Sequence, residues 1–164
     1  MGVQLCNFAT LQLCNFATLQ LFSMPNKLPV IKVVGVSGGG KSTLVKALRN
    51  VGYDARPISQ EHSNVPDLWK QFEFPKVLIF LDVSVAAQSE RRPDVEWTEA
   101  ARQQELQRLT HAIAHSDLRI DTSQLTPAQV AHLAISFLSA QNINQAKEPL
   151  PPVKATGSAT RTSS

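Results

Sequence analysis

The feature that most constrains this chain is a glycine-rich octet set between a strand pattern and a helix pattern. Residues 35–42 read Gly-Val-Ser-Gly-Gly-Gly-Lys-Ser and match G-x-x-x-x-G-K-[ST] at every fixed position. Residues 30–34 before it are Val-Ile-Lys-Val-Val, a β-branched run typical of a buried strand. After it, Leu44 and Leu48 recur on one helical face, and Gly52 is a helix stop signal. The segment therefore predicts a strand, a tight turn and a helix in succession.

The rest of the chain continues this alternation of strand and helix patterns. Further strands are predicted at 54–59, 77–82 and 118–121; helices at 86–92, 96–115 and 127–140; and a short helix or loop at 65–74. Residues 77–82 are apolar without alternation, as expected where helices cover both faces of a sheet. The order predicts an α/β domain, a three-layer α/β/α sandwich with a mostly parallel sheet of about four strands.

The two ends of the chain differ in composition from this region. Residues 5–12 recur without change at 13–20, which is typical of translated duplicated DNA. A short amphipathic helix or an added strand at 5–20 is the alternative. From residue 147 the chain is Pro, Ser, Thr and Lys with almost no large apolar side chain, which predicts disorder. The expected organisation is an extension at 1–23, a domain at 24–146 and a disordered tail at 147–164.

Charge and cysteine content exclude several classes of partner. Residues 24–146 carry 13 basic and 12 acidic side chains, so no basic stripe predicts a nucleic-acid partner. No apolar run reaches the ~18 residues that a membrane span needs. The two cysteines are Cys6 and Cys14, so the predicted domain has no disulfide framework. A cytoplasmic location is the expectation that fits these observations.

The octet also predicts the chemistry of the site. Successive inward amides form a nest for phosphate, and residues without Cβ allow the backbone to curl closely around it. Lys41 supplies a mobile charge to the β- and γ-phosphates, while the Ser42 hydroxyl is placed to bind Mg²⁺. The residues expected to contact the nucleoside triphosphate, taken as ATP, are Gly35, Gly38, Gly39, Gly40, Lys41, Ser42 and Thr43. The alternative is a glycine-rich turn that binds nothing.

Over roughly residues 30–138 the chain resembles the small P-loop kinases, such as shikimate, gluconate, dephospho-coenzyme A and nucleoside monophosphate kinases. The resemblance rests on the loop with Gly-Lys-Ser-Thr, on residues 78–84 leading into a helix that ends Glu-Arg-Arg, and on Ile-Asp-Thr-Ser-Gln-Leu-Thr-Pro at 120–127. It implies the P-loop NTPase fold and a lid in which Arg91 and Arg92 neutralise transferred charge. We expect these arginines to gain a partner only when phosphate binds. A helix terminus with exposed cations remains the alternative.

Two carboxylates are candidates for the metal-side and catalytic role. Asp82 ends an apolar strand, where a Walker B aspartate holds Mg²⁺ through water. The resemblance aligns this strand with one on the other side of the loop strand, where the aspartate is more often structural. Glu61 follows the second strand, where small-molecule kinases place an acidic residue facing metal and substrate; it could orient or deprotonate an acceptor hydroxyl. The alternatives are a surface charge for Glu61 and a helix cap for Asp82.

The chain departs from these kinases in the interval that should bind the acceptor. Only 17 residues, 60–76, separate the second strand from Val77, too few for a helical substrate domain and a further strand. Trp69, Phe72 and Phe74 either wall an acceptor pocket or complete the core. The expected function is a kinase-like transfer of the γ-phosphoryl group of Mg-ATP to an unknown small molecule. The alternative is an ATPase or nucleotide switch acting on a protein partner.

Overall fold

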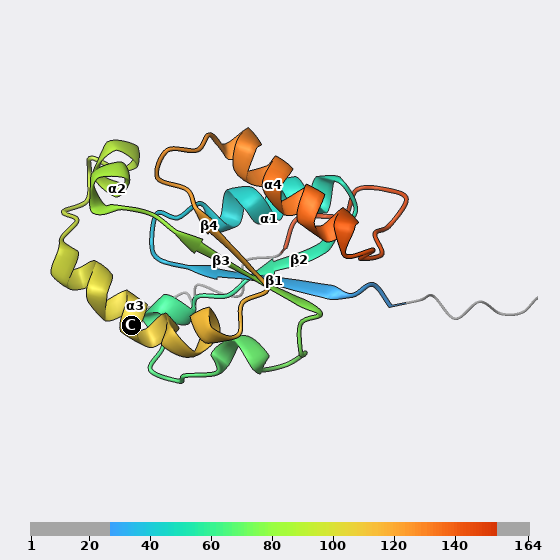
Figure 1. Ribbon diagram of the computed structural model, residues 1–164, viewed down its shortest axis with the longest axis horizontal. Coiled ribbons are helices and arrows are strands. Elements are labelled where there is room, and N and C mark those ends of the chain that lie inside the picture. Colours follow the sequence, from blue (N-terminus) through green and yellow to red (C-terminus); the bar gives the residue numbers. More distant parts are fainter. Residues whose placement is uncertain (1–26, 154–164) are drawn as a thin grey trace, which may run out of the picture.

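The computed structural model describes residues 27–153. The expected extension at 1–23 and the last part of the expected tail, 154–164, lie outside the described residues. The elements, in chain order, are β1 (Val30–Gly35), α1 (Lys41–Asn50), β2 (Asp54–Pro57), the 3₁₀ turns η1 (Gln60–His62) and η2 (Leu68–Lys70), β3 (Val77–Asp82), α2 (Val85–Arg91), α3 (Glu99–Ala114), β4 (Leu118–Asp121) and α4 (Pro127–Ala140). Figure 1 shows their arrangement.

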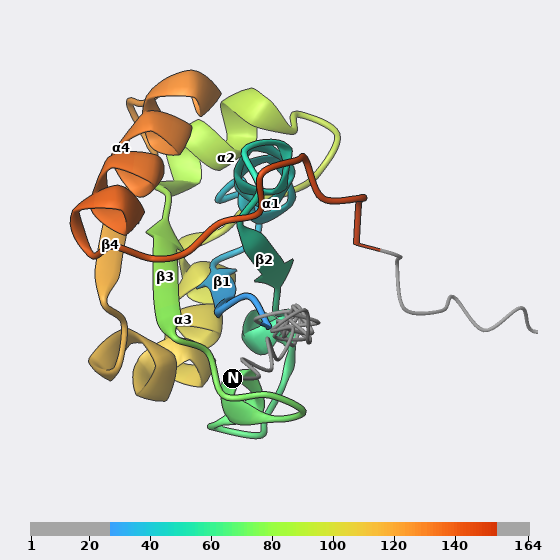
Figure 2. The same cartoon turned by 90° about the vertical axis from the view of Figure 1, so that its right-hand side faces the viewer.

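The four strands form one sheet in the order β2-β1-β3-β4, and every pairing is parallel. Helices α1 and α4 cover one face of the sheet, and α3 covers the other (Figures 1 and 2). This confirms the α/β class and the parallel sheet of four strands. Because the strands are parallel, their carboxyl ends meet at one edge, where β1 runs into α1 and β3 into α2.

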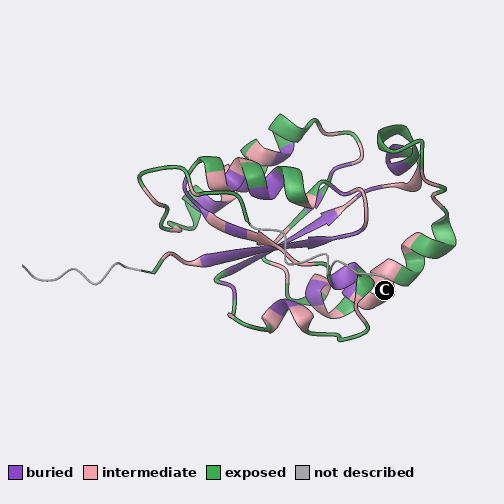
Figure 3. Cartoon of the chain, turned by 180° about the vertical axis from the view of Figure 1, so that it is seen from behind, coloured by how far each residue is buried: buried purple, intermediate pink, exposed green. Residues whose placement is uncertain are grey.

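The core consists of two apolar clusters, one on each face of the sheet. Side chains of β1 and β3 alternate between the α1–α4 side and the α3 side, so both strands are buried almost throughout (Figure 3). Lys32 is the one charged residue of β1, and it is buried as well. Its Nζ lies 2.8 Å from the carbonyl oxygens of both Trp69 and Gln71, and it thereby holds the η2 turn against the sheet. Burial, followed by the nearby charge of Arg56, lowers the pKa of Lys32.

Side-chain caps fix where the later helices begin. The Ser84, Thr98 and Thr126 side chains each accept from the amide three residues on, at the starts of α2, α3 and α4. Helix α3 therefore begins at Glu99, not at the predicted residue 96, because Thr98 has extended backbone and caps the first turn. Helix α4 begins at Pro127 as predicted, with a capping box between Thr126 and Gln129.

The chain beyond α4 returns along the carboxyl end of α1. The Ala146 amide donates to the Gly52 carbonyl at 2.8 Å, and the Leu150 amide donates to the Arg49 carbonyl at 2.9 Å. Gly52 has φ +94°, and a Cβ there would lie 2.3 Å from the Ala146 oxygen, so only glycine fits this approach. Residues 147–153 thus have defined contacts, in contrast to the disorder predicted from residue 147, because backbone hydrogen bonds replace the apolar contacts that this segment lacks.

Candidate functional site

The glycine-rich octet forms a tight loop at the carboxyl edge of the sheet, between β1 and α1. A Cβ on Gly35 would lie 2.3 Å from the Leu81 carbonyl oxygen, so β1 approaches β3 too closely for any side chain. The Val36 amide donates to the same oxygen at 3.3 Å. Gly38 and Gly40 have φ +73° and +90°, the left-handed region that turns the backbone toward α1. Gly35 therefore shapes the loop, and the glycines after it curl the backbone.

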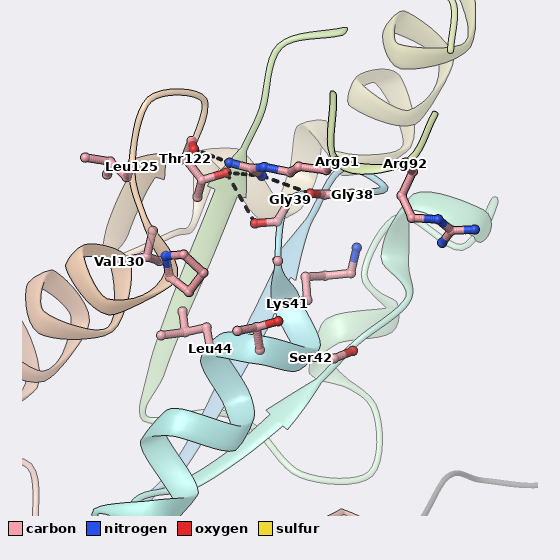
Figure 4. Close-up of a pocket in the computed structure, with 13 residues that line it drawn as sticks. Gly38, Gly39, Lys41, Ser42, Leu44, Arg91, Arg92, Thr122, Leu125 and Val130 are labelled. Atoms are coloured by element: carbon pink, nitrogen blue, oxygen red, sulfur yellow. Dashed lines mark hydrogen bonds between the residues drawn. The ribbon is translucent and has the colours of Figure 1, made fainter. Parts of the chain in front are cut away.

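A pocket of about 440 Å³ opens beside this loop, which we call the loop pocket. It is lined by residues 38–44 and by Arg91, Arg92, Thr122, Leu125, Pro127 and Val130 (Figure 4). Six of the seven predicted contact residues, 38–43, line it; Gly35 does not. A Cβ on Gly40 would meet no atom within 4 Å, so it would enter the open space of the pocket. The backbone and the start of α1 leave room there for an anionic ligand.

Lys41 and Glu61 lie together beside the loop. The Lys41 Nζ is 2.6 Å from Glu61 Oε1, and it donates to the carbonyls of Gly35 at 2.9 Å and Val36 at 3.1 Å. The two side chains are 13% and 3% exposed. Arg108 of α3 donates to the Glu61 carbonyl at 3.2 Å and fixes η1 in place. Glu61 is therefore the predicted carboxylate that adjoins the lysine.

Asp82 occupies a different environment at the end of β3. Its Oδ1 accepts from the Val83 amide at 2.8 Å and from Arg102 Nη2 at 2.8 Å. Arg102 also donates Nε–H to the Val83 carbonyl at 2.9 Å, so the pair fastens α3 to the end of β3. Neither Asp82 nor Glu61 is among the residues that line the loop pocket, but Glu61 contacts Lys41, which is. The contacts of Asp82 give it a structural role, and the sheet order separates it from Glu61.

The two predicted lid arginines already have partners. Arg91 Nη1 donates to the Gly38 carbonyl at 3.0 Å and to Thr122 Oγ1 at 3.1 Å, and Nη2 donates to the Thr122 carbonyl. Arg92 pairs with exposed Asp94 at 2.9 Å. Figure 4 shows the two guanidinium groups pointing in different directions. The expectation that they lack partners until phosphate binds is wrong, although both line the loop pocket.

Two side chains that the sequence did not single out, those of Glu105 and Gln88, meet at Ser37. Its amide donates to Glu105 Oε2 at 2.8 Å, and its hydroxyl donates to Oε1 of the same carboxylate at 2.5 Å. Its carbonyl accepts from Gln88 Nε2 at 2.6 Å. Glu105 is on α3 and Gln88 on α2, so both helices hold one loop residue. The sequence contains no local signal for this contact, because Ser37 and Glu105 are 68 residues apart.

The side-chain oxygens beside the loop could supply only a few of the ligands of a metal ion. Within residues 27–153, three or more His, Cys, Asp or Glu side chains nowhere gather as a metal cluster. Glu61 Oε2 is buried and has no hydrogen-bond partner among the described residues. This oxygen and the exposed Ser42 hydroxyl fit Mg²⁺, which commonly takes one or two protein ligands and completes its shell with phosphate oxygens and water. His62 is 65% exposed, with Nε2 3.7 Å from Glu61 Oε1.

The aromatic side chains of residues 69–74 do not line the loop pocket. Trp69 is 2% exposed in the core, and its Nε1 donates to His111 Nδ1 at 3.0 Å. Phe72 and Phe74 are 102% and 69% exposed. Trp69 therefore completes the core, one of the two alternatives, whereas Phe72 and Phe74 fit neither of them. Phe72 has φ +65°, and its side chain lies in solvent.

The chain was compared with known protein families and with curated proteins. A scan against models of protein families and a search of curated proteins both returned no match for the chain. The helices between residues 27 and 153 are all too short or too polar to cross a bilayer.

Proposed function

We propose that this chain is a P-loop nucleotide-binding protein that takes the Mg²⁺ complex of a nucleoside triphosphate, ATP, in the loop pocket. One observation carries the proposal: a lysine at the first position of α1 folds back over a glycine cradle and meets a buried carboxylate with one free oxygen. Lys41 and Glu61 are 2.6 Å apart, and Glu61 Oε2 has no partner among the described residues. A turn that bound nothing would gain no stability from this arrangement, because burying a charged pair costs desolvation.

Different residues in and beside the loop pocket bind different parts of the nucleotide. Amides of residues 38 and 40–43 and the positive end of α1 receive the phosphates, and Lys41 moves from the Gly35 and Val36 carbonyls onto the β- and γ-oxygens. The apolar side, Leu125 and Val130, packs against the base or ribose. Ser42 and Glu61 would hold Mg²⁺, which would neutralise phosphate charge.

The reaction that this site supports best is transfer of the γ-phosphoryl group to a hydroxyl of a small molecule. The acceptor oxygen attacks the γ-phosphorus, the bond to the β–γ bridging oxygen breaks, and the diphosphate leaves with that electron pair. Glu61 orients the acceptor and takes its proton, the role open to a carboxylate beside the phosphate lysine. Lys41 and Arg92 stabilise the charge on the transferring group.

The test begins with binding and then asks for the acceptor. Calorimetry with ATP and Mg²⁺ should give saturable binding that Lys41→Ala abolishes; equal affinity in parent and variant would sink the proposal. The protein is next incubated with Mg-ATP, with and without a metabolite extract. Diphosphate release that needs the extract supports the kinase. Slow release without any acceptor supports the ATPase or switch instead.

A further inference from the structure

The peptide group between Val36 and Ser37 is held by opposite charges. Its carbonyl accepts from Lys41 Nζ at 3.1 Å, and its amide donates to Glu105 Oε2 at 2.8 Å. The Ser37 hydroxyl adds a 2.5 Å bond to Glu105 Oε1. An amide and a hydroxyl converging on one carboxylate are the same donors that hold phosphate oxygens in anion sites. Glu105 therefore accepts from the amide and hydroxyl of Ser37, next to the Val36 carbonyl that Lys41 contacts.

We propose that Glu105 sets the preference of the loop between nucleoside diphosphates and triphosphates. This inference rests on the proposed function. The terminal phosphate of a triphosphate lies against Lys41, and one peptide group separates the Lys41 ammonium from the Glu105 carboxylate. Like charges at this spacing repel strongly in a partly buried site. A diphosphate, whose charge ends one phosphate earlier, leaves Glu105 on Ser37, whereas a triphosphate expels it.

Other contacts of Ser37 determine which partner moves. Gln88 is 1% exposed, and its Nε2 holds the Ser37 carbonyl at 2.6 Å. Arg91 holds the next carbonyl, that of Gly38, at 3.0 Å. The loop backbone is thus fixed from α2, so the flexible Glu105 side chain is the part that leaves.

The experiment measures dissociation constants of the full chain for Mg-ATP and Mg-ADP by calorimetry. Glu105→Gln removes the charge and keeps the shape. It should tighten ATP binding about tenfold and change ADP binding less than about twofold, because only the third phosphate meets the carboxylate. Glu99→Gln is the matched control: it removes the same charge from an exposed position on the same helix and should leave both constants unchanged.

Each result decides the matter. An unchanged ratio of ATP to ADP affinity in Glu105→Gln, or weaker ATP binding, overturns the inference while the proposed function survives. A parent protein that binds neither nucleotide overturns both. If Glu105→Gln does not fold, Ser37→Ala takes its place: losing the hydroxyl bond loosens the carboxylate and should tighten ATP binding a few-fold. No change in Ser37→Ala then overturns the inference.

Discussion

Lys41 and Glu61 form a buried ion pair, with Nζ 2.6 Å from Oε1 and the Glu61 side chain 3% exposed. From the sequence alone, Lys41 is expected to supply a mobile charge to the phosphates. In the structure it is also the partner of the Glu61 charge. Lys41 therefore neutralises a buried charge in the free protein, and its removal alone would leave Glu61 buried without a partner.

Replacing Lys41 should affect both binding and stability. We expect Lys41→Ala to lose Mg-ATP binding and to lower the free energy of unfolding by about 3 kcal/mol, because it leaves Glu61 buried without its partner. Calorimetry and urea unfolding measure the two effects. The control is the double variant Lys41→Ala with Glu61→Gln, which should regain stability but not binding. A single variant as stable as the parent would contradict the structural half of this prediction.

Glu61 and Asp82 should separate cleanly by their effects. Glu61→Gln should lower turnover about a hundredfold, the scale of lost general-base help, and should also weaken Mg-ATP binding, because Glu61 is a proposed Mg²⁺ ligand. Asp82→Asn should instead lower stability, because it weakens the 2.8 Å pair with Arg102, and should leave the turnover of the folded protein close to that of the parent. Steady-state kinetics and urea unfolding of both variants test this assignment. The reverse pattern would make Asp82 the functional carboxylate.

The two arginines of the loop pocket should also differ. Within residues 27–153 the Arg92 guanidinium pairs only with exposed Asp94, so Arg92→Ala should leave stability close to that of the parent and lower turnover at least tenfold. Arg91→Ala should lower stability by about 2 kcal/mol, because it removes bonds to Gly38 and Thr122. Thermal unfolding and kinetics measure both. Arg92→Lys, which keeps the charge without the planar guanidinium, is the control. Normal turnover in Arg92→Ala would show that Arg92 takes no part in the reaction.

Part of the expected tail should contribute to stability. Chains ending at residue 146 and at residue 153 differ by the contacts of Leu150 and Pro151 with Arg49. We expect the shorter chain to be less stable by about 2 kcal/mol, at roughly 1 kcal/mol per hydrogen bond. Its ATP affinity should be unchanged, since these contacts are at the other end of α1. Equal urea midpoints for the two chains would show that residues 147–153 contribute nothing.

Stability should fall on acidification through His111. Burial, then the charges of Lys70 and His115, lowers the pKa of His111 below its ordinary value near 6.5. The unfolded chain therefore binds the proton first as pH drops, and folded His111 must keep Nδ1 free to accept from Trp69. The contribution is complete above pH 6.5 and is lost below it. Urea unfolding at pH 8 and pH 5.5 should show a smaller loss in His111→Gln; equal losses would contradict this.

The elements that the sequence predicted best are those fixed by local chemistry. The apolar run at 77–82 became β3 at those bounds, and the Thr126-Pro127 pair set the start of α4. Caps and strand patterns act over a few residues, so a linear sequence carries them in full. The glycine-rich octet likewise predicted which backbone lines the loop pocket, because glycine tolerance of left-handed φ is a local property.

The side-chain partners could not be predicted because they depend on how α2 and α3 lie over the loop. Ser37 and Glu105 meet across 68 residues, and Arg91 reaches Thr122 across 31. Phe72 shows the opposite difficulty. Its apolar character predicts burial, but its left-handed backbone directs it into solvent. The position of a residue in the folded chain, and not its residue type alone, determines its partners and its exposure.

The close approach of Gly35 to Leu81 has a consequence for how the protein is made. The loop takes its shape only after β3 has paired with β1, since the Val36 amide and the Leu81 carbonyl bond across them. The carboxylate beside Lys41 is held in place by α3, which is translated later still. A nascent chain on the ribosome thus contains the whole octet well before it contains a binding site. Under the proposed function, nucleotide would stabilise the finished protein by mass action, but it would not act as a template for the early steps of folding.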